Sequence, residues 1–302
     1  MITPQIMKKI INTSIFFLSV FTLSSCGDEK KEESSDTKVE SLVSPERIAN
    51  SGNLLKLQNQ FFSIPSPIQT AILIRKQNLE YSPELVSGTD KVDNYLSRHK
   101  KALNLGVLGS DLAYLSNYKD IKKSLDCLGK IESLAEDLDI KANINPSILK
   151  RFNENINTPD SLNALNAEFY KNAERYLKDN LQNEVAALIL TGGWIESLHF
   201  ATQNSDNQFL RTRVAEQKNT VGNIVNIMAS FEGKLGREIC KELIELEAIF
   251  RQMKTAYNYE KPITDKDNKM TYLKGKSNVE ISDQQLESIK AAVSRIRSLI
   301  IS

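Results

Sequence analysis

The chain of 302 residues is 40% hydrophobic and 25% charged, which is ordinary for a globular protein and is enough sequence for one or two domains. Its 39 basic and 38 acidic residues give a net charge of +1, and loss of Lys8 and Lys9 with residues 1–25 would leave −1. No basic field is present to attract nucleic acid and no nucleic-acid-binding motif occurs, so we expect no nucleic-acid partner.

Residues 1–25 have the pattern of a secretory signal peptide. Lys8 and Lys9 form the basic segment, and residues 10–23 form an apolar run that is too short for a comfortable membrane span. The run leads into the sequence Leu-Ser-Ser-Cys, which ends at Cys26 and resembles the lipobox of bacterial lipoproteins. That resemblance implies cleavage before Cys26 and acylation of its thiol, so that lipid chains anchor the protein to a membrane. The alternative is an ordinary secretory signal followed by a chance cysteine.

Residues 26–42 are expected to form a disordered tether behind the lipid. The segment is charged, rich in serine and free of aromatic residues, a composition that does not support a packed core. Its acidic residues lie close behind Cys26, which resembles the surface-export signal of Bacteroidota lipoproteins; a solvated spacer is the alternative. We expect the protein in the bacterial cell envelope, at the outer membrane, on either its periplasmic or its outer surface.

Residues 43–302 are expected to form a single all-α domain, a multi-helix bundle. Before its centre, the pattern predicts a short amphipathic piece at 54–62 and helices at 67–79, 89–116, 120–138 and 159–179. After its centre, helices are predicted at 208–228, 234–257 and 282–300, the last opened by a Ser282-x-x-Gln285 capping box. Residues 259–281 break the helical pattern and are expected to be irregular or to pair 270–273 with 278–281 as a small β-hairpin.

The central helix is predicted at 183–203, where apolar or small residues occupy two faces. It contains Gly192 and Gly193, each of which costs about 1 kcal/mol relative to alanine inside a helix. Gly106 and Gly109 lie in the same way within the 89–116 pattern. Close approach of another backbone is the usual compensation, so we expect these glycines to mark a helix crossing.

The two glycine-bearing segments also resemble each other. A shift of 83 residues places Gly109 over Gly192 and Leu112 over Ile195, and a further helix follows each copy. The bundle is therefore either two tandem helical hairpins or a fold in which two buried helices are similar by chance.

Three segments together resemble an uncharacterised family of predicted lipoproteins from Bacteroidota. They are residues 64–67, 103–114 and 185–198, and the similarity runs through most of 55–205. The sequence differs from that family at Leu108 and His199, where an aromatic residue is expected. The resemblance implies an envelope location and a helical fold, and it implies no activity.

Motifs for catalysis or cofactor binding are sparse. His99 and His199 have no neighbour at metal-ligand spacing, and no P-loop, dinucleotide-binding or G-x-S-x-G motif occurs, so we expect neither metal nor cofactor. Beyond Cys26, Cys127 and Cys240 are expected either as buried free thiols on separate helices or as a disulfide, which an envelope location would allow.

If a functional pocket exists, the sequence places it where the glycine helices meet. Asp111, Tyr114, Trp194 and Glu196 follow one turn past the glycines and combine aromatic surface with carboxylates. The structural interpretation makes Trp194 a core residue and leaves the two acids solvated or capping.

Two functions remain open from the sequence. The first is a non-enzymatic, lipid-anchored helical scaffold that binds a protein, peptide or glycan. The second is a hydrolase-like envelope enzyme that uses an acidic pair such as Asp111 and Glu196. The lack of histidine pairs and of any nucleophile motif favours the first.

Overall fold

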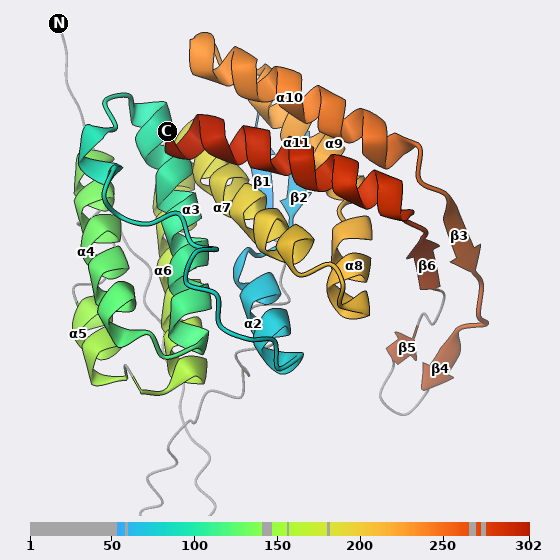
Figure 1. The fold of residues 1–302 in the computed structure, drawn as a ribbon, viewed down its shortest axis with the longest axis horizontal. Coiled ribbons are helices and arrows are strands. Elements are labelled where there is room, and N and C mark those ends of the chain that lie inside the picture. Colours follow the sequence, from blue (N-terminus) through green and yellow to red (C-terminus); the bar gives the residue numbers. More distant parts are fainter. Residues whose placement is uncertain are drawn as a thin grey trace, which may run out of the picture. The chain divides into compact units, whose positions relative to one another are not determined.

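Two long helices, α3 (Arg98–Asn117) and α7 (Asn183–Gln203), form the centre of the described chain (Figure 1). The computed structural model describes residues 53–57, 60–140, 147–155, 157–179, 182–265, 270–272 and 276–302. Contacts divide the chain into two units, Met1–Leu42 and Val43–Ser302, and every described residue belongs to the second. The expected signal peptide, the tether and Cys26 lie outside the described residues.

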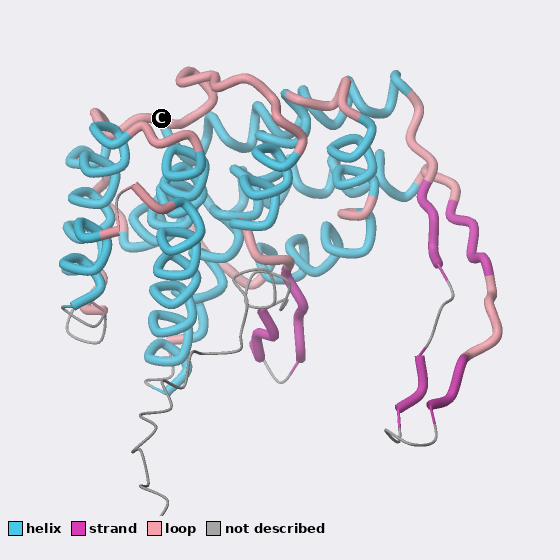
Figure 2. The backbone as a smooth tube through the Cα atoms, turned by 90° about the horizontal axis from the view of Figure 1, so that it is seen from below, coloured by secondary structure: helices cyan, strands magenta, loops and turns pink. Residues whose placement is uncertain are grey.

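Further helices surround this central pair, and the prediction of an all-α multi-helix bundle is confirmed. They are α2 (Ile68–Lys76), α4 (Ile121–Asp137), α5 (Ser147–Glu154), α6 (Pro159–Asp179), α8 (Gln208–Ala215), α9 (Lys218–Ala229), α10 (Lys234–Arg251) and α11 (Asp283–Ile301), with a 3-10 turn at Val92–Asn94. Helix α4 packs on α3 and α8 packs on α7, whereas α2, α6 and α11 contact both central helices (Figures 1 and 2). Helix α3 forms a hairpin with α4, but the short α8 follows α7, and the next hairpin along the chain is α9 with α10.

The central helices are buried on all sides. Every residue from 102 to 117 of α3 and from 185 to 202 of α7 is buried, whereas α4, α10 and α11 bury only a stripe. Among the described residues, α7 alone has the length and composition of a membrane-crossing helix, and its most apolar 18-residue window is 100% buried within the fold. Complete burial among other helices is the environment of a core helix.

Glycines let the backbones of α3 and α7 touch. A Cβ on Gly106 would overlap the carbonyl oxygen of Ile189 and lie 2.6 Å from the amide nitrogen of Gly193. A Cβ on Gly192 would overlap the carbonyl oxygen of Leu103 and lie 2.7 Å from its carbonyl carbon. No side chain fits at these two positions, so the separation of the helices depends on the glycines.

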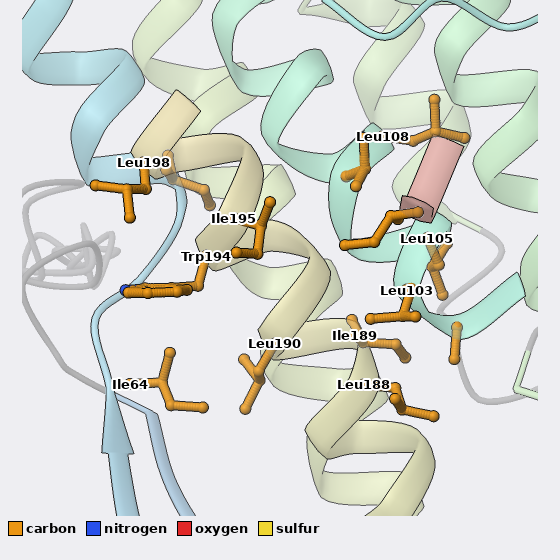
Figure 3. Packing of buried hydrophobic residues seen from close by; sticks show 14 of the residues in the cluster. Ile64, Leu103, Leu105, Leu108, Leu188, Ile189, Leu190, Trp194, Ile195 and Leu198 are labelled. Atoms are coloured by element: carbon orange, nitrogen blue, oxygen red, sulfur yellow. The ribbon is translucent and has the colours of Figure 1, made fainter. Parts of the chain in front are cut away.

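Apolar side chains pack around this crossing. Figure 3 shows Leu103, Leu105 and Leu108 of α3 on one side of α7, and Trp194 and Leu198 on the side near Ile64. Helix α7 therefore packs between α3 and the first strand of the hairpin that ends at Ile64.

Capping residues determine where three of the helices begin. Ser97 accepts a hydrogen bond from the amide of Lys100 (3.1 Å), so α3 begins at Arg98 rather than near residue 89 as the apolar pattern predicted. Asp120 caps α4 in the same way. The capping box predicted at Ser282 and Gln285 is confirmed, with both reciprocal hydrogen bonds present.

A β-hairpin occupies the segment for which a short amphipathic helical piece was predicted, so that prediction is wrong. Strands β1 (Asn53–Leu57) and β2 (Gln60–Ile64) pair antiparallel, with Leu57 opposite Gln60. The segment is too short for its apolar spacing to distinguish a helix from a strand, and the polar Gln58 and Asn59 between two apolar runs were the missed turn signal.

A second antiparallel ribbon lies between α10 and α11. Strand β3 (Thr255–Asn258) pairs with β6 (Lys276–Val279), and β4 (Ile263–Asp265) pairs with β5 (Met270–Tyr272) (Figure 1). A β-hairpin was predicted in this region, but the predicted pairing of 270–273 with 278–281 is wrong. The chain reverses between Asp265 and Met270, where polar turn-forming residues are concentrated, and not at 274–277.

We predict that Gly106→Ala and Gly192→Ala each lower the free energy of unfolding by about 1–3 kcal/mol, because the added methyl group meets backbone that cannot move aside. Helix propensity alone predicts the opposite sign, a gain of about 1 kcal/mol. Urea denaturation measures the change, with Gly129→Ala as the matched control. Gly129 lies inside α4 with no atom within 4 Å of an added Cβ, so its substitution should stabilise. Equal stabilisation by all three variants would contradict a steric crossing.

Candidate functional site

A buried ion pair lies one turn beyond the glycine crossing. Arg297 of α11 donates from Nε to Glu196 Oε2 (2.7 Å) and from Nη2 to Glu196 Oε1 (2.8 Å). The Glu196 side chain is 0% exposed and that of Arg297 is 13% exposed. Both carboxylate oxygens of Glu196 are therefore occupied by one guanidinium group in a geometry that excludes water.

Asp111 of α3 lies beside this pair. Its Oδ2 accepts hydrogen bonds from the amide (3.0 Å) and the hydroxyl (2.5 Å) of Ser87. Burial and the negative charge of Glu196 raise the pKa of Asp111 well above its ordinary value, against the opposing effects of the Ser87 hydrogen bond and the positive charge of Arg297. Asp111 Oδ1 is buried and has no hydrogen-bond partner in the part of the chain that the structure describes.

The connection between α2 and α3 is held in place by hydrogen bonds to buried side chains. Arg297 Nη2 donates to the carbonyl oxygen of Leu85 (3.1 Å). Ser87 binds Asp111, and the amide of Ser82 donates to the Tyr114 hydroxyl (3.0 Å). Helices α3 and α11 thus hold one loop through polar side chains.

A cavity of about 370 Å³ opens between this loop and α4. Its lining combines the acid Asp111 with neighbouring apolar, polar and charged side chains. They are Pro83, Val86, Ser87, Gly88, Thr89, Asp90, Leu108, Leu115, Lys122, Lys123, Asp126 and Cys127. Gly88 has φ +78°, a left-handed conformation that favours glycine, so the loop turns back at this position.

The structure brings together only part of the predicted cluster. Asp111 and Glu196 interact, but Tyr114 packs against Phe200 (5.0 Å between ring centroids) and Tyr118 (4.9 Å). Trp194 faces another part of the fold, where its Nε1 donates to Gln217 Oε1 (2.9 Å). Trp194 is a core residue with a satisfied indole and does not line the cavity near Asp111.

The four predicted structural glycines also separate. Gly106, Gly192 and Gly193 lie at the α3–α7 crossing, where Ser110 Oγ donates to the carbonyl oxygen of Gly193 (3.0 Å). The carbonyl oxygen of Gly109 instead accepts from Asn166 Nδ2 of α6 (2.9 Å).

Both described cysteines are free thiols on separate helices. Cys127 is buried and its Sγ donates to the carbonyl oxygen of Leu108 (3.2 Å); burial raises the pKa of this thiol well above its ordinary value. Cys240 is half-buried on α10.

His99 packs edge-on against Phe231 (5.7 Å between centroids). Within the described ranges, no three His, Cys, Asp or Glu side chains gather in a group able to hold a metal ion.

Sequence reasoning missed the residues that complete the site, which are Arg297, Ser87 and His199. Arg297 follows Ile296 in the apolar stripe of α11, and a cation at the edge of a buried stripe was the available signal. Ser87 had no signal, because its role depends on where a loop folds back.

Comparison with protein-family models, with curated proteins and with solved structures gave no match. The site therefore has to be interpreted from its own geometry.

We predict that Arg297→Ala lowers the free energy of unfolding by about 3–5 kcal/mol, because it leaves Glu196 charged and buried without its partner. Arg295→Ala on the same helix is the matched control. Arg295 is 50% exposed and pairs with Glu242 and Glu245 at the surface, so its loss should cost less than about 1 kcal/mol. Chemical denaturation measures both variants, and similar losses for the two would contradict a special role for the buried pair.

His199 makes stability depend on pH. Burial lowers the pKa of its ring from 6.5 to about 4, so the folded chain holds it neutral. Between those values the unfolded state binds the proton and the folded state does not. The contribution is therefore complete above pH 6.5 and is lost as the pH falls. Asp111 acts in the opposite direction, because its raised pKa stabilises the fold at low pH and this contribution is lost as the pH rises.

We predict that His199→Phe reduces the stability lost between pH 7 and pH 4.5 by about 2 kcal/mol, because phenylalanine fills the site without binding a proton. Urea denaturation of the variant and the original chain at both pH values measures the difference. An unchanged loss would show that His199 does not carry the effect.

Proposed function

We propose that this chain is a lipid-anchored protein of the bacterial cell envelope whose helical part binds a ligand and does not catalyse a reaction. The observation that carries the second half of this proposal is the state of the acidic pair. Glu196 is fully buried with both oxygens bonded to Arg297, and the buried Asp111 accepts hydrogen bonds from Ser87.

An acidic pair that catalyses hydrolysis needs a different environment. A general acid or base has to lie within hydrogen-bond reach of the substrate, directly or through one water molecule. Glu196 is used inside the fold, whereas Asp111 lines the cavity. The alternative of an envelope hydrolase therefore gains support from Asp111 alone, and the burial and pairing of Glu196 oppose it.

The location rests on the sequence. The basic segment, the apolar run and Cys26 occur in the order and spacing of a lipoprotein signal, which supports anchoring to a membrane through Cys26. A protein, a peptide or a glycan of the envelope is the class of partner we propose for the helical part, and no nucleic acid.

Metabolic labelling with a palmitate analogue tests the anchor. We predict that the chain incorporates label and sediments with membranes, and that Cys26→Ala loses both properties because the thiol is the acyl acceptor. Cys240→Ala is the control, since this half-buried thiol should leave labelling and sedimentation unchanged. Labelling that persists in Cys26→Ala would remove the basis for the proposed anchor.

A further inference from the structure

The cavity beside Asp111 has the dimensions of a small-molecule site. Its volume is about 370 Å³, within the range of about 300–1,000 Å³ for ligand pockets. One wall is the connection between α2 and α3, which Arg297, Asp111 and Tyr114 hold in place. The other walls are α3 and α4, so the cavity lies among elements that the core positions.

The inner surface of the cavity is apolar except at its floor, where Asp111 lies. Leu108, Leu115 and Val86 supply hydrocarbon surface. Asp111 supplies the polar floor; it is 2% exposed, and its Oδ1 has no donor partner. Burial and the neighbouring Glu196 raise the pKa of Asp111, which favours the neutral acid.

The rim carries charges of both signs. Lys122 and Asp126 come from α4 and Asp90 comes from the loop, and none of these three forms an ion pair with another described residue. Lys123 donates from Nζ to the carbonyl oxygen of Pro83 (3.4 Å), which holds its ammonium group at the same rim. Two cations and two carboxylates leave the rim of the cavity with a formal charge of zero.

The equal numbers of positive and negative side chains at the rim favour some classes of ligand over others. A simple anion would meet Asp90 and Asp126, and a simple cation would meet Lys122 and Lys123, so either one would gain from one pair and lose to the other. A molecule that carries both charges a few bonds apart can pair with both, and its apolar part can lie against Leu108 and Leu115.

We propose that this cavity binds a small zwitterion of the amino-acid type with an apolar side chain. Lys122 receives the carboxylate, Asp126 and Asp90 receive the ammonium group, and the apolar inner wall receives the side chain. This assignment rests on the non-catalytic binding role proposed above, adds a small-molecule ligand to the protein, peptide or glycan partner named there, and does not depend on the lipid anchor.

Isothermal titration of the full chain in detergent micelles tests the assignment. L-leucine and L-alanyl-L-leucine are the zwitterionic probes. 4-Methylpentanoate lacks the ammonium group of leucine, and 3-methylbutylamine lacks its carboxylate. We expect saturable binding of at least one zwitterion, and at least tenfold weaker binding of both singly charged compounds.

Substitutions at the rim test whether the zwitterion binds in this cavity. Lys122→Ala and Asp126→Ala should each weaken binding of the zwitterion at least tenfold, because each removes one of its charge partners. Both residues are exposed on α4, so thermal unfolding should show that the fold survives. Lys241→Ala, an exposed lysine on α10, is the matched control and should leave binding unchanged.

Three outcomes would overturn the assignment. They are no binding of either zwitterion, equal binding of the singly charged compounds, and unaltered binding by both α4 variants. Loss of palmitate labelling and of membrane sedimentation is measured separately, so failure of the cavity assignment and failure of the anchor are distinguishable. A zwitterion that is chemically converted during titration, detected by chromatography, would instead contradict the non-catalytic function.

Discussion

The contact between the backbones of α3 and α7 is the constraint on which the other packing depends. Gly106 and Gly192 allow each helix to lie against a carbonyl group of the other, at a separation that no other residue permits. This approach places Asp111 and Glu196 close enough to interact, because each follows its glycine by about one helical turn. It also leaves both helices buried on every side, so the surrounding helices pack onto them as a pair.

The buried polar groups add specificity to an otherwise apolar centre. Replacing such a network with hydrocarbon often costs little, so the pairing of Glu196 with Arg297 is weak evidence for stability. The geometry of this pair has a clearer role in fixing the position of α11. Arg297 reaches both Glu196 of α7 and the carbonyl oxygen of Leu85, so α11 has one position in which all of these groups are satisfied. The same contacts hold the wall of the cavity.

Periodicity made the helical class and most helices predictable, because a helix that buries a stripe records that stripe in its sequence. Ser282 and Asp120 marked helix starts for the same local reason. The β1–β2 hairpin was not predictable, because so short an apolar segment does not distinguish a helix from a strand.

In the candidate site, Asp111 and Glu196 were found because they follow the glycines. Trp194 was misplaced because spacing along a helix does not show which side faces which neighbour. Ser87 and Arg297 depend on contacts across 24 and 101 residues, and no local pattern records those.

The separation in sequence between Glu196 and Arg297 also bears on the order of synthesis. The helix that carries Arg297 follows every other described helix, whereas Leu85, its other partner, lies 212 residues earlier. Helices α3 and α7 are therefore both complete while Arg297, the cation that pairs with Glu196, has not yet been made. A chain that lacks α11 would have to bury an unpaired carboxylate in order to close its core, so the core should remain open until α11 is present.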